Sequence, residues 1–430
     1  MAKKIYEYSW WYDHLRYITD AYIKASYRRL VFKGMDKIPD DAEVIYAPNH
    51  CCALMDPLAV LVMRHEPVVF VARADIFGSP FIAKVLNFLR IMPINRIRDG
   101  FRSVAKSAET IDKSIEVLNN GVKFCILSEG THRPMHSLMP IGKGITKVAL
   151  GAVESGGAKR VVIVPVGLEY GDYFRYRTTL QVRVCDPVDV TALASSMPDA
   201  TEREVSDAIR RRVGDELKEN IVYIPDDEGY EAVWELSCIS TGKVPPLKIE
   251  ERFLQNRAAV EKIGKFREER PSEAAALMER ASRFRECRKK AGISLLSLAG
   301  GKTALKVVAY TLLSLLCLPV FAVMAAASLP VWLPSEIVAG KMEDKAFKNS
   351  FRCGIMVFGW TLMLLIWAVV LFCTLKWYWA LAALAVILPA PFVVYDCFEL
   401  ARLTASHWRL LFRKDLGREY REIEKEINNI

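Results

Sequence analysis

His50 and Asp56 are the two residues of this chain best suited to acid–base chemistry. A neutral imidazole whose far nitrogen is held by a carboxylate is a positioned general base, able to take a proton from a hydroxyl. The two residues are six positions apart, and on one straight helix they would point about 240° apart. They can meet only if the chain bends between them. The alternative is that His50 only packs and Asp56 only caps a helix.

The surrounding pattern predicts such a bend. Residues 44–46 form an apolar, β-branched run that is typical of a buried strand. Asp56 followed by Pro57 is typical of a helix start, because Asp is a good N-cap and Pro suits the first helical position. We therefore expect His50 at a strand end and Asp56 at the start of a helix over residues 57–64.

Three basic side chains indicate an anionic ligand. Arg133 ends the loop 127–133, where Gly130 would let backbone approach a ligand and the Arg could fork onto a phosphate. Lys143 precedes a predicted helix whose N-terminal amides could also hold an anion. Arg96 ends another strand-like run. Basic residues on strand-end loops, beside a His–Asp pair, point to a phosphorylated substrate.

Alternating patterns between residues 43 and 190 must position these side chains. Apolar strand-like runs alternate with helical periodicity, which predicts an α/β fold: a sheet covered by helices, with strand ends converging on one edge. The predicted strands are 44–47, 68–72, 92–94, 122–127, 161–166 and 180–184, and the predicted helices are 57–64, 80–89, 102–119 and 145–154.

Composition limits the class of protein. Hydrophobic residues make up 52% of the 430 residues, and the net charge of +9 suits an anionic membrane surface or phosphate-bearing substrates. No nucleic-acid partner is expected, because no zinc finger, RNP-type motif or basic arm occurs. The ten scattered cysteines favour reduced thiols in a cytosol-facing protein. The N-terminus lacks the apolar stretch of a signal peptide.

The C-terminal third predicts membrane segments. Residues 307–333, 354–375 and 377–395 are long runs without a charge, and about 20 residues span a bilayer core of ~30 Å. The last two runs predict a transmembrane hairpin. The first contains Pro319 and is either one tilted span or a re-entrant pair of half-helices. Basic residues flank all three runs, and only an even number of crossings puts them on one face, so the re-entrant form is favoured.

We expect five segments in all. Residues 1–42 form an amphipathic N-terminal helix, which lies either in a membrane interface or on the domain core, and its lead-in. Residues 43–190 form the α/β domain, 191–303 a charged helical appendage without a catalytic motif, 304–398 the membrane region and 399–430 a basic cytoplasmic tail.

The motifs also occur in the order of the four sequence blocks of the glycerolipid acyltransferases. The first 190 residues therefore resemble the lysophosphatidate and glycerol-3-phosphate acyltransferase superfamily. The four blocks are Asn49-His50…Asp56-Pro57, Ile94-Asn95-Arg96, Ser128-Glu129-Gly130-Thr131 and Val164-Pro165-Val166.

The resemblance implies roles for these residues. His50 would activate the acceptor hydroxyl with support from Asp56, and Pro165 would shape the acyl-donor side. The residues implied to bind the acceptor are Arg96, Glu129, Gly130, Thr131, Arg133 and Lys143.

Three departures refine the resemblance. The usual spacing is H-x4-D, whereas five residues separate His50 from Asp56, and His132 stands between Thr131 and Arg133. Ser128 replaces the usual proline. A fungal-type branch, the glycerol-3-phosphate/dihydroxyacetone-phosphate acyltransferases, resembles this chain in spacing and in that histidine. The acceptor implied is glycerol-3-phosphate, glycerone phosphate or 1-acyl-glycerol-3-phosphate.

The sequence therefore favours an integral membrane O-acyltransferase of phospholipid biosynthesis. Its catalytic domain would face the cytoplasm, at a bacterial inner membrane or the endoplasmic reticulum. It would use no cofactor, and its co-substrate would be acyl-CoA, acyl carrier protein or acyl phosphate. One alternative is a non-catalytic lipid-binding scaffold with the same fold. Another is a zinc site built from Cys51, Cys52, His132 and His136, since H-x3-H is a zinc-like spacing.

Overall fold

The computed structural model describes residues 4–94, 101–155, 160–300 and 303–430. The chain forms two compact units. Unit 1 comprises Met1–Lys24, Leu30–Tyr173 and Leu180–Ile221, and unit 2 comprises Ala25–Arg29, Phe174–Thr179 and Val222–Ile430. The segment 191–303, expected to be one appendage, is divided between them, because its first two helices pack with unit 1.

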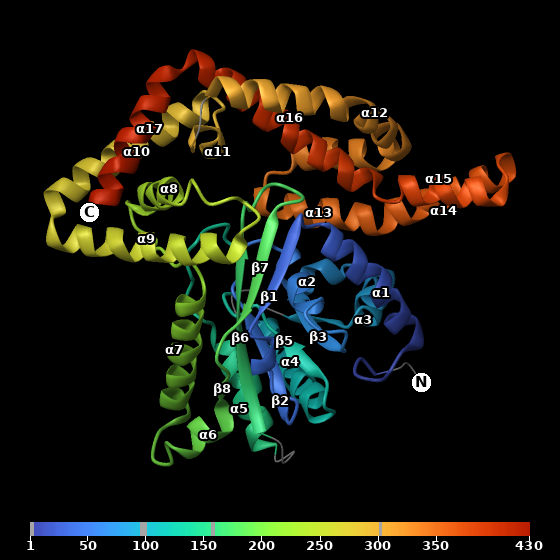
Figure 1. Ribbon diagram of the computed structural model, residues 1–430. Coiled ribbons are helices and arrows are strands. Elements are labelled where there is room, and N and C mark those ends of the chain that lie inside the picture. Colours follow the sequence, from blue (N-terminus) through green and yellow to red (C-terminus); the bar gives the residue numbers. More distant parts are fainter. Residues whose placement is uncertain (1–3, 95–100, 156–159, 301–302) are drawn as a thin grey trace. The chain divides into compact units, whose positions relative to one another are not determined.

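Unit 1 is built on a mixed eight-stranded sheet with the order β1-β7-β6-β2-β5-β3-β4, and β8 lies beside β6 (Figure 1). The strands from β6 to β4 pair in parallel, while β7 and β8 run antiparallel to β6. This arrangement confirms the predicted α/β fold class. The strands are β1 Arg29–Lys33, β2 Ala42–Pro48, β3 Val68–Arg73, β4 Ile91–Ile94, β5 Lys123–Cys125, β6 Arg160–Tyr170, β7 Thr179–Val184 and β8 Val188–Asp189.

One apolar core holds three helices against this sheet. Buried side chains of α4 (Phe101–Asn119), α5 (Lys143–Glu154) and α7 (Glu202–Asn220) join strand residues such as Ile45 and Ile163 in a single cluster. In α7 the buried apolar residues recur every four positions, as a helix face requires. A capping box begins this helix: Thr201 and Glu204 bond each other's backbone N–H.

The remaining elements of unit 1 differ in part from those predicted from the sequence. All six predicted strands are present, but β1 and β8 were missed. Within residues 1–42, where an amphipathic helix and its lead-in were expected, the helix is α1 (Trp10–Ala25), and the chain then continues into β1. The helix expected from Pro57 is α2 (Met55–Leu61) and begins two residues earlier. The reason is that Asp56 bonds the preceding loop instead of capping its own helix. The other helices of unit 1 are α3 Pro80–Phe88 and α6 Val190–Ser195.

Unit 2 begins with charged helices and continues into long apolar ones. The first group is α8 Tyr230–Ser240, α9 Ile249–Glu269, α10 Pro271–Lys290 and α11 Leu295–Leu298, with α17 Lys414–Asn429 packed on α8 and α10. Among the described residues, three helical stretches are long and apolar enough to cross a membrane, Thr303–Lys341, Lys345–Thr374 and Trp377–Phe412. They contain α12 Thr303–Lys341, α13 Lys348–Ile355, α14 Thr361–Thr374, α15 Trp377–Ile387 and α16 Ala390–Phe412.

The first apolar stretch is one continuous helix and does not form the half-helices favoured from the sequence. α12 runs through Pro319 without interruption and bends in its second half (Figure 1). Pro330 lies in that half and removes one backbone N–H. Nearby carbonyls of Ala325 and Ala327 accept hydrogen bonds from the indoles of Trp332 and Trp367, at 3.0 and 2.9 Å. These indole N–H groups thus add hydrogen bonds to the backbone of α12 near Pro330.

The predicted hairpin is present. Only Leu375 and Lys376 separate α14 from α15. No residue of α14 is buried, and Ala380 is the buried residue of α15, so both helices present apolar side chains outward. The aromatic rings of Trp377, Tyr378 and Trp379 gather at the turn, a composition typical of a membrane boundary.

Candidate active site

The carboxylate of Asp56 organises the loop between β2 and α2. It is fully buried, and its Oδ2 accepts hydrogen bonds from the backbone N–H groups of Cys51 and Cys52, both at 2.7 Å. The same oxygen lies 2.8 Å from Nδ1 of His50. Hydrogen bonds to this one carboxylate therefore hold the loop in a bend and bring the Asp56 side chain into contact with the His50 imidazole. This is the bend that the six-residue separation required.

Hydrogen bonds fix both the ring and the backbone of His50. Because a carboxylate accepts from Nδ1, that nitrogen carries the proton, and Nε2 is the atom able to accept one. The backbone of His50 is fixed as well: its N–H donates to Glu129 at 2.6 Å, and its carbonyl accepts from the Arg133 N–H at 2.9 Å. The ring of His132 meets the His50 ring edge-on, with centroids 5.4 Å apart.

The strand end that carries His50 is locked to β6. The Asn49 side chain accepts from the Leu168 N–H at 2.6 Å and donates to the Leu168 carbonyl at 3.2 Å. These bonds continue the β2–β6 pairing beyond Pro48. In the loop itself, Ala53 has φ +46°, a left-handed conformation that costs a non-glycine residue energy. The loop between His50 and Asp56 thus contains one strained residue, directly after Cys51 and Cys52, whose N–H groups bond Asp56.

Glu129 connects the His50 loop to the loop 127–133. Its Oε1 accepts from the His50 N–H, and its Oε2 accepts from the Met139 N–H at 2.8 Å. Burial raises the pKa of this carboxyl above its ordinary value, and the two backbone N–H groups oppose that shift. The contacts observed for Glu129 are therefore internal ones. Its predicted contact with the acceptor stays a prediction.

The other residues predicted to bind substrate lie around this connection. Gly130 turns the chain at φ +71°, and Thr131 beside it is exposed. Arg133 donates to Ser137 Oγ at 3.2 Å. Lys143 is exposed at the first turn of α5, directly after Gly142, whose N–H donates to the Ser128 carbonyl at 2.7 Å. Arg96 lies outside the described residues, so its predicted phosphate contact stays a prediction.

Pro165 lies in β6 opposite Ala47 of β2. A proline inside a sheet normally costs a ladder hydrogen bond. Here β6 pairs with β8 only up to Ile163 and with β7 from Val166 onward, so Pro165 falls between two antiparallel partners. Its carbonyl accepts from the Cys185 N–H at 3.0 Å. Pro165 thus fits the strand that holds the His50 loop, and its donor-side role stays a prediction.

Two residues near the site, Tyr170 and Tyr173, were not found by the sequence analysis, and a third, His136, was considered only as a zinc ligand. The hydroxyl of Tyr170, the last residue of β6, donates to Asp56 Oδ1 at 2.7 Å. His136 is buried with its Nδ1 2.9 Å from Glu169 Oε1. The Tyr173 ring lies beside His136, with centroids 5.1 Å apart. The predicted strand 161–166 stopped four residues before Tyr170, which ends the observed β6, so the sequence contained no signal for these residues beyond the strand itself.

The zinc grouping considered from the sequence is not formed. Among the described residues, no three or more His, Cys, Asp or Glu side chains are arranged to hold a metal ion. Cys51 Sγ faces the Met135 carbonyl and Cys52 Sγ faces the Tyr173 carbonyl. Burial raises the pKa of both thiols well above the ordinary value, so both stay protonated at neutral pH.

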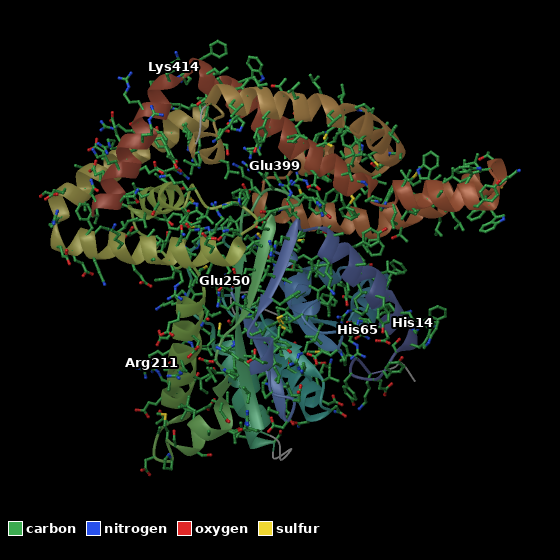
Figure 2. All side chains as sticks on the ribbon, in the orientation of Figure 1. His14, His65, Arg211, Glu250, Glu399 and Lys414 are labelled. Carbon is green, nitrogen blue, oxygen red and sulfur yellow. The ribbon has the colours of Figure 1, made fainter. Side chains whose placement is uncertain are left out.

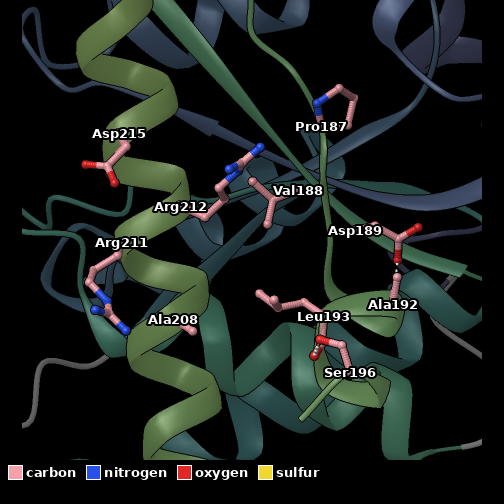
Figure 3. Close-up of a pocket in the computed structure, with 10 residues that line it drawn as sticks. All are labelled: Pro187, Val188, Asp189, Ala192, Leu193, Ser196, Ala208, Arg211, Arg212 and Asp215. Atoms are coloured by element: carbon pink, nitrogen blue, oxygen red, sulfur yellow. Dashed lines mark hydrogen bonds between the residues drawn. The ribbon is translucent and has the colours of Figure 1, made fainter.

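A separate shallow cavity of about 590 Å³ lies between α6 and α7 (Figure 3). Arg211, Arg212 and Asp215 line it from α7, and Asp189 lines it from β8. Asp189 also caps α6 by accepting from the Ala192 N–H at 2.9 Å. The cavity contains none of the residues predicted for the site, so it does not mark the reaction centre.

The chain carries an acyltransferase-family domain. Residues 29–169 match the family model described as Acyltransferase, and this stretch contains His50, Asp56 and Glu129. The match confirms the family that the four motif blocks indicated.

Curated relatives are similar over the same region. A 1-acyl-sn-glycerol-3-phosphate acyltransferase of Borreliella burgdorferi is 30% identical over 122 residues, 28% of this chain and 46% of that protein. Glycerol-3-phosphate O-acyltransferase 2 of Saccharomyces cerevisiae is 24% identical over 142 residues, 33% of this chain and 19% of that protein. The chain thus spans less than half the length of these relatives.

A solved structure is also similar. The crystal structure of the 1-acyl-sn-glycerophosphate acyltransferase PlsC from Thermotoga maritima is 19% identical, with a TM-score of 0.35 over 48% of this chain and 79% of that one.

Proposed function

We propose that this protein transfers a fatty acyl group from an acyl thioester to a hydroxyl of a glycerol-phosphate acceptor. The observation that carries the proposal is the contact between His50 Nδ1 and the buried, fully hydrogen-bonded Asp56 carboxylate. Such a carboxylate orients the imidazole and stabilises the imidazolium that forms when Nε2 takes a proton. The names of the two curated relatives support a glycerol-phosphate acceptor.

The proposed reaction is a direct transfer. His50 Nε2 takes the proton of the acceptor hydroxyl while the oxygen attacks the thioester carbonyl carbon. The carbon–sulfur bond then breaks, and the departing thiolate receives the proton from the imidazolium. No acyl-enzyme is required, and the raised thiol pKa values of Cys51 and Cys52 are consistent with that, because a protonated thiol is a poor nucleophile.

Positioning would contribute much of the rate. Lys143 and Arg133 flank the loop that Glu129 connects to His50, and with Arg96 they supply the positive charge that an acceptor phosphate needs. A phosphate held there would place the hydroxyl against the base, and orientation of that kind can supply a large part of a rate enhancement. A lipid-binding scaffold would not need a base with a buried carboxylate, so the dyad favours an enzyme.

One assay tests the proposal. Purified full-length protein in detergent is given labelled acyl-CoA, acyl carrier protein thioester or acyl phosphate, with glycerol-3-phosphate, glycerone phosphate or 1-acyl-glycerol-3-phosphate as acceptor. We expect acyl ester formation with at least one thioester, and none with the His50→Ala variant. Transfer by the acyl phosphate alone would contradict the thioester donor, and equal turnover by His50→Ala would contradict the mechanism.

A further inference from the structure

The connection between β5 and α5 is unusually long. Residues 126–142 form neither helix nor strand, and connections longer than about 12–15 residues are uncommon in compact domains and usually functional. This one carries four of the residues predicted to bind the acceptor, Glu129, Gly130, Thr131 and Arg133. The contacts that hold the connection in place therefore bear on the proposed reaction.

Glu129 closes part of this connection into a loop. Its Oε2 accepts from the Met139 N–H at 2.8 Å, and its Oε1 accepts from the His50 N–H at 2.6 Å. Inside the loop, the Arg133 N–H donates to the His50 carbonyl at 2.9 Å. We call residues 129–139 the Glu129 loop. These backbone hydrogen bonds tie its first half to His50.

The second half of the Glu129 loop is held by His136. The His136 side chain is only 3% exposed, and its Nδ1 lies 2.9 Å from Oε1 of Glu169, which belongs to β6. The Tyr173 ring lies beside the imidazole, with centroids 5.1 Å apart. Ser137 is buried as well, and its hydroxyl accepts from the Arg133 guanidinium at 3.2 Å. The loop thus inserts an imidazole into unit 1 and contacts β6 through it.

The surroundings of His136 are polar where a protein core is normally apolar. The Glu169 side chain is mostly buried, and Gln181 of β7, directly opposite Glu169 in the sheet, is buried too. Burial of polar and ionisable groups costs free energy that apolar side chains of similar volume would not cost. Such a pair is poorly explained by stability alone. Its use is to fix one arrangement of two chain segments, because the imidazole must meet the carboxylate.

The end of β6 connects this pair to the candidate catalytic dyad. Tyr170 donates to Asp56 Oδ1 at 2.7 Å, and Glu169, the preceding residue, contacts His136. The Tyr173 ring lies between them, 5.9 Å from the Tyr170 ring and 5.1 Å from the His136 ring by centroids. One strand end therefore contacts both the carboxylate that orients the base and the loop that carries the predicted acceptor ligands.

We propose that His136, paired with Glu169, is a positioning residue that holds the Glu129 loop in the arrangement that binds the acceptor. This inference rests on the proposed acyl transfer. His136 acts through Arg133, the loop residue predicted to contact the acceptor phosphate. The contact between His50 and Asp56 does not depend on His136, because it is made by the loop between β2 and α2. Loss of His136 therefore affects acceptor binding more than the chemical step.

Matched substitutions test the proposal in the full-length protein in detergent. His136→Leu removes both ring nitrogens, whereas His136→Asn keeps an amide nitrogen near the position of Nδ1 that can contact Glu169. Glu169→Met removes the partner and serves where His136→Leu does not fold. His65 is the matched control: it follows α2 (Figure 2), and its ring nitrogens lie 3.1 Å from Asp13 and 3.3 Å from Asp20. It is a carboxylate-paired histidine of the same unit outside the Glu129 loop.

Hydrogen–deuterium exchange measures the loop without requiring turnover. We expect peptides covering residues 129–139 to exchange at least tenfold faster in His136→Leu and Glu169→Met than in the wild type. The same peptides should exchange at the wild-type rate in His136→Asn and His65→Leu. Unchanged exchange of the loop in both disruptive variants would overturn the proposal. Faster exchange that extends to α7 would give His136 a general stabilising role and would also overturn it.

Steady-state kinetics measure the consequence for the reaction. We expect His136→Leu to raise the acceptor KM at least tenfold and to leave the donor KM within twofold, with His136→Asn close to the wild type. Equal increases in both KM values, or a loss of kcat alone, would overturn the acceptor role. A wild-type protein that transfers to no acceptor would refute the proposed function and with it this role, whereas the exchange measurement would still decide whether His136 holds the loop.

Discussion

The hydroxyl of Tyr170 and the carboxylate of Asp56 form a 2.7 Å hydrogen bond on the side of the carboxylate opposite His50. With the two backbone N–H groups of Cys51 and Cys52, this bond completes the set of four donors around one buried carboxylate. Tyr170 ends β6, the strand that pairs with β2 just before His50. The pairing register of β6 with β2 therefore fixes the position of the Asp56 carboxylate.

Tyr170→Phe tests this relationship. A hydrogen bond to a charged group contributes about 1.5–3 kcal/mol, so we expect kcat to fall by roughly 10- to 100-fold. The acceptor KM should change little, because Tyr170 acts on Asp56 and not on the substrate. Steady-state kinetics of the purified variant measure both quantities. A rise in KM with kcat unchanged would mean that Tyr170 contacts the acceptor instead.

His50→Ala should abolish transfer while expression and membrane insertion continue, because the base is needed for chemistry. Asp56→Asn should also lose most activity. Its amide has one oxygen for the donors that now share the carboxylate, and its NH₂ would face donor groups. Initial rates and thermal stability in detergent separate the two effects. Wild-type turnover by His50→Ala would refute the proposed base.

Glu129→Gln distinguishes a positioning role from a substrate contact. The amide can accept from only one of the His50 and Met139 N–H groups that the carboxylate now accepts from. We expect kcat to fall several-fold with the acceptor KM nearly unchanged. Arg96→Ala should do the opposite and raise the acceptor KM, because a contact made equally in ground and transition states appears in KM. Matching KM increases in both variants would assign Glu129 to the phosphate site.

The thiols of Cys51 and Cys52 should be poor nucleophiles at neutral pH. Burial raises both pKa values, so the thiolate fraction, and with it the rate of alkylation, should stay low near pH 7 and grow only as the pH rises toward the raised pKa. Mass spectrometry after iodoacetamide treatment of the native protein measures this. Cys51→Ala and Cys52→Ala should each keep turnover within about tenfold of wild type. Loss of all turnover in either variant, if that variant is folded, would favour a mechanism with an acyl-enzyme intermediate on the substituted cysteine.

Membrane topology remains a prediction that labelling can decide. Basic residues flank the three apolar stretches, and an even number of crossings keeps them on the cytoplasmic face. Since α12 is one continuous helix, this arrangement requires α12 to lie in the membrane without crossing it. We therefore predict that Glu343→Cys and Asp415→Cys, in a background without other reactive thiols, resist an impermeant maleimide in intact cells. Lys376→Cys, in the two-residue turn between α14 and α15, should react. Labelling at both Glu343→Cys and Asp415→Cys would show that α12 crosses once.

The sequence alone determined the features that depend on local pattern. Strand-like runs such as 44–47 and 161–166 are apolar because a parallel sheet buries both faces, so six strands were predictable. The order of the motif blocks determined the acyltransferase family, which the match over residues 29–169 confirms. Charge-free runs determined the three apolar helices, because length and hydropathy suffice for that inference.

Tertiary structure decided which partner each polar group has. Asp56 looked like a helix cap, but it bonds the preceding loop and Tyr170, which is 114 positions away in the sequence. Glu129 looked like a substrate ligand, yet its oxygens bond two backbone N–H groups of this chain. In α1 the charged Arg16 is buried and bonds the Leu61 carbonyl at the end of α2, whereas the apolar Trp11 is exposed. Sequence periodicity shows that a helix has two faces, but only packing determines which one meets the protein.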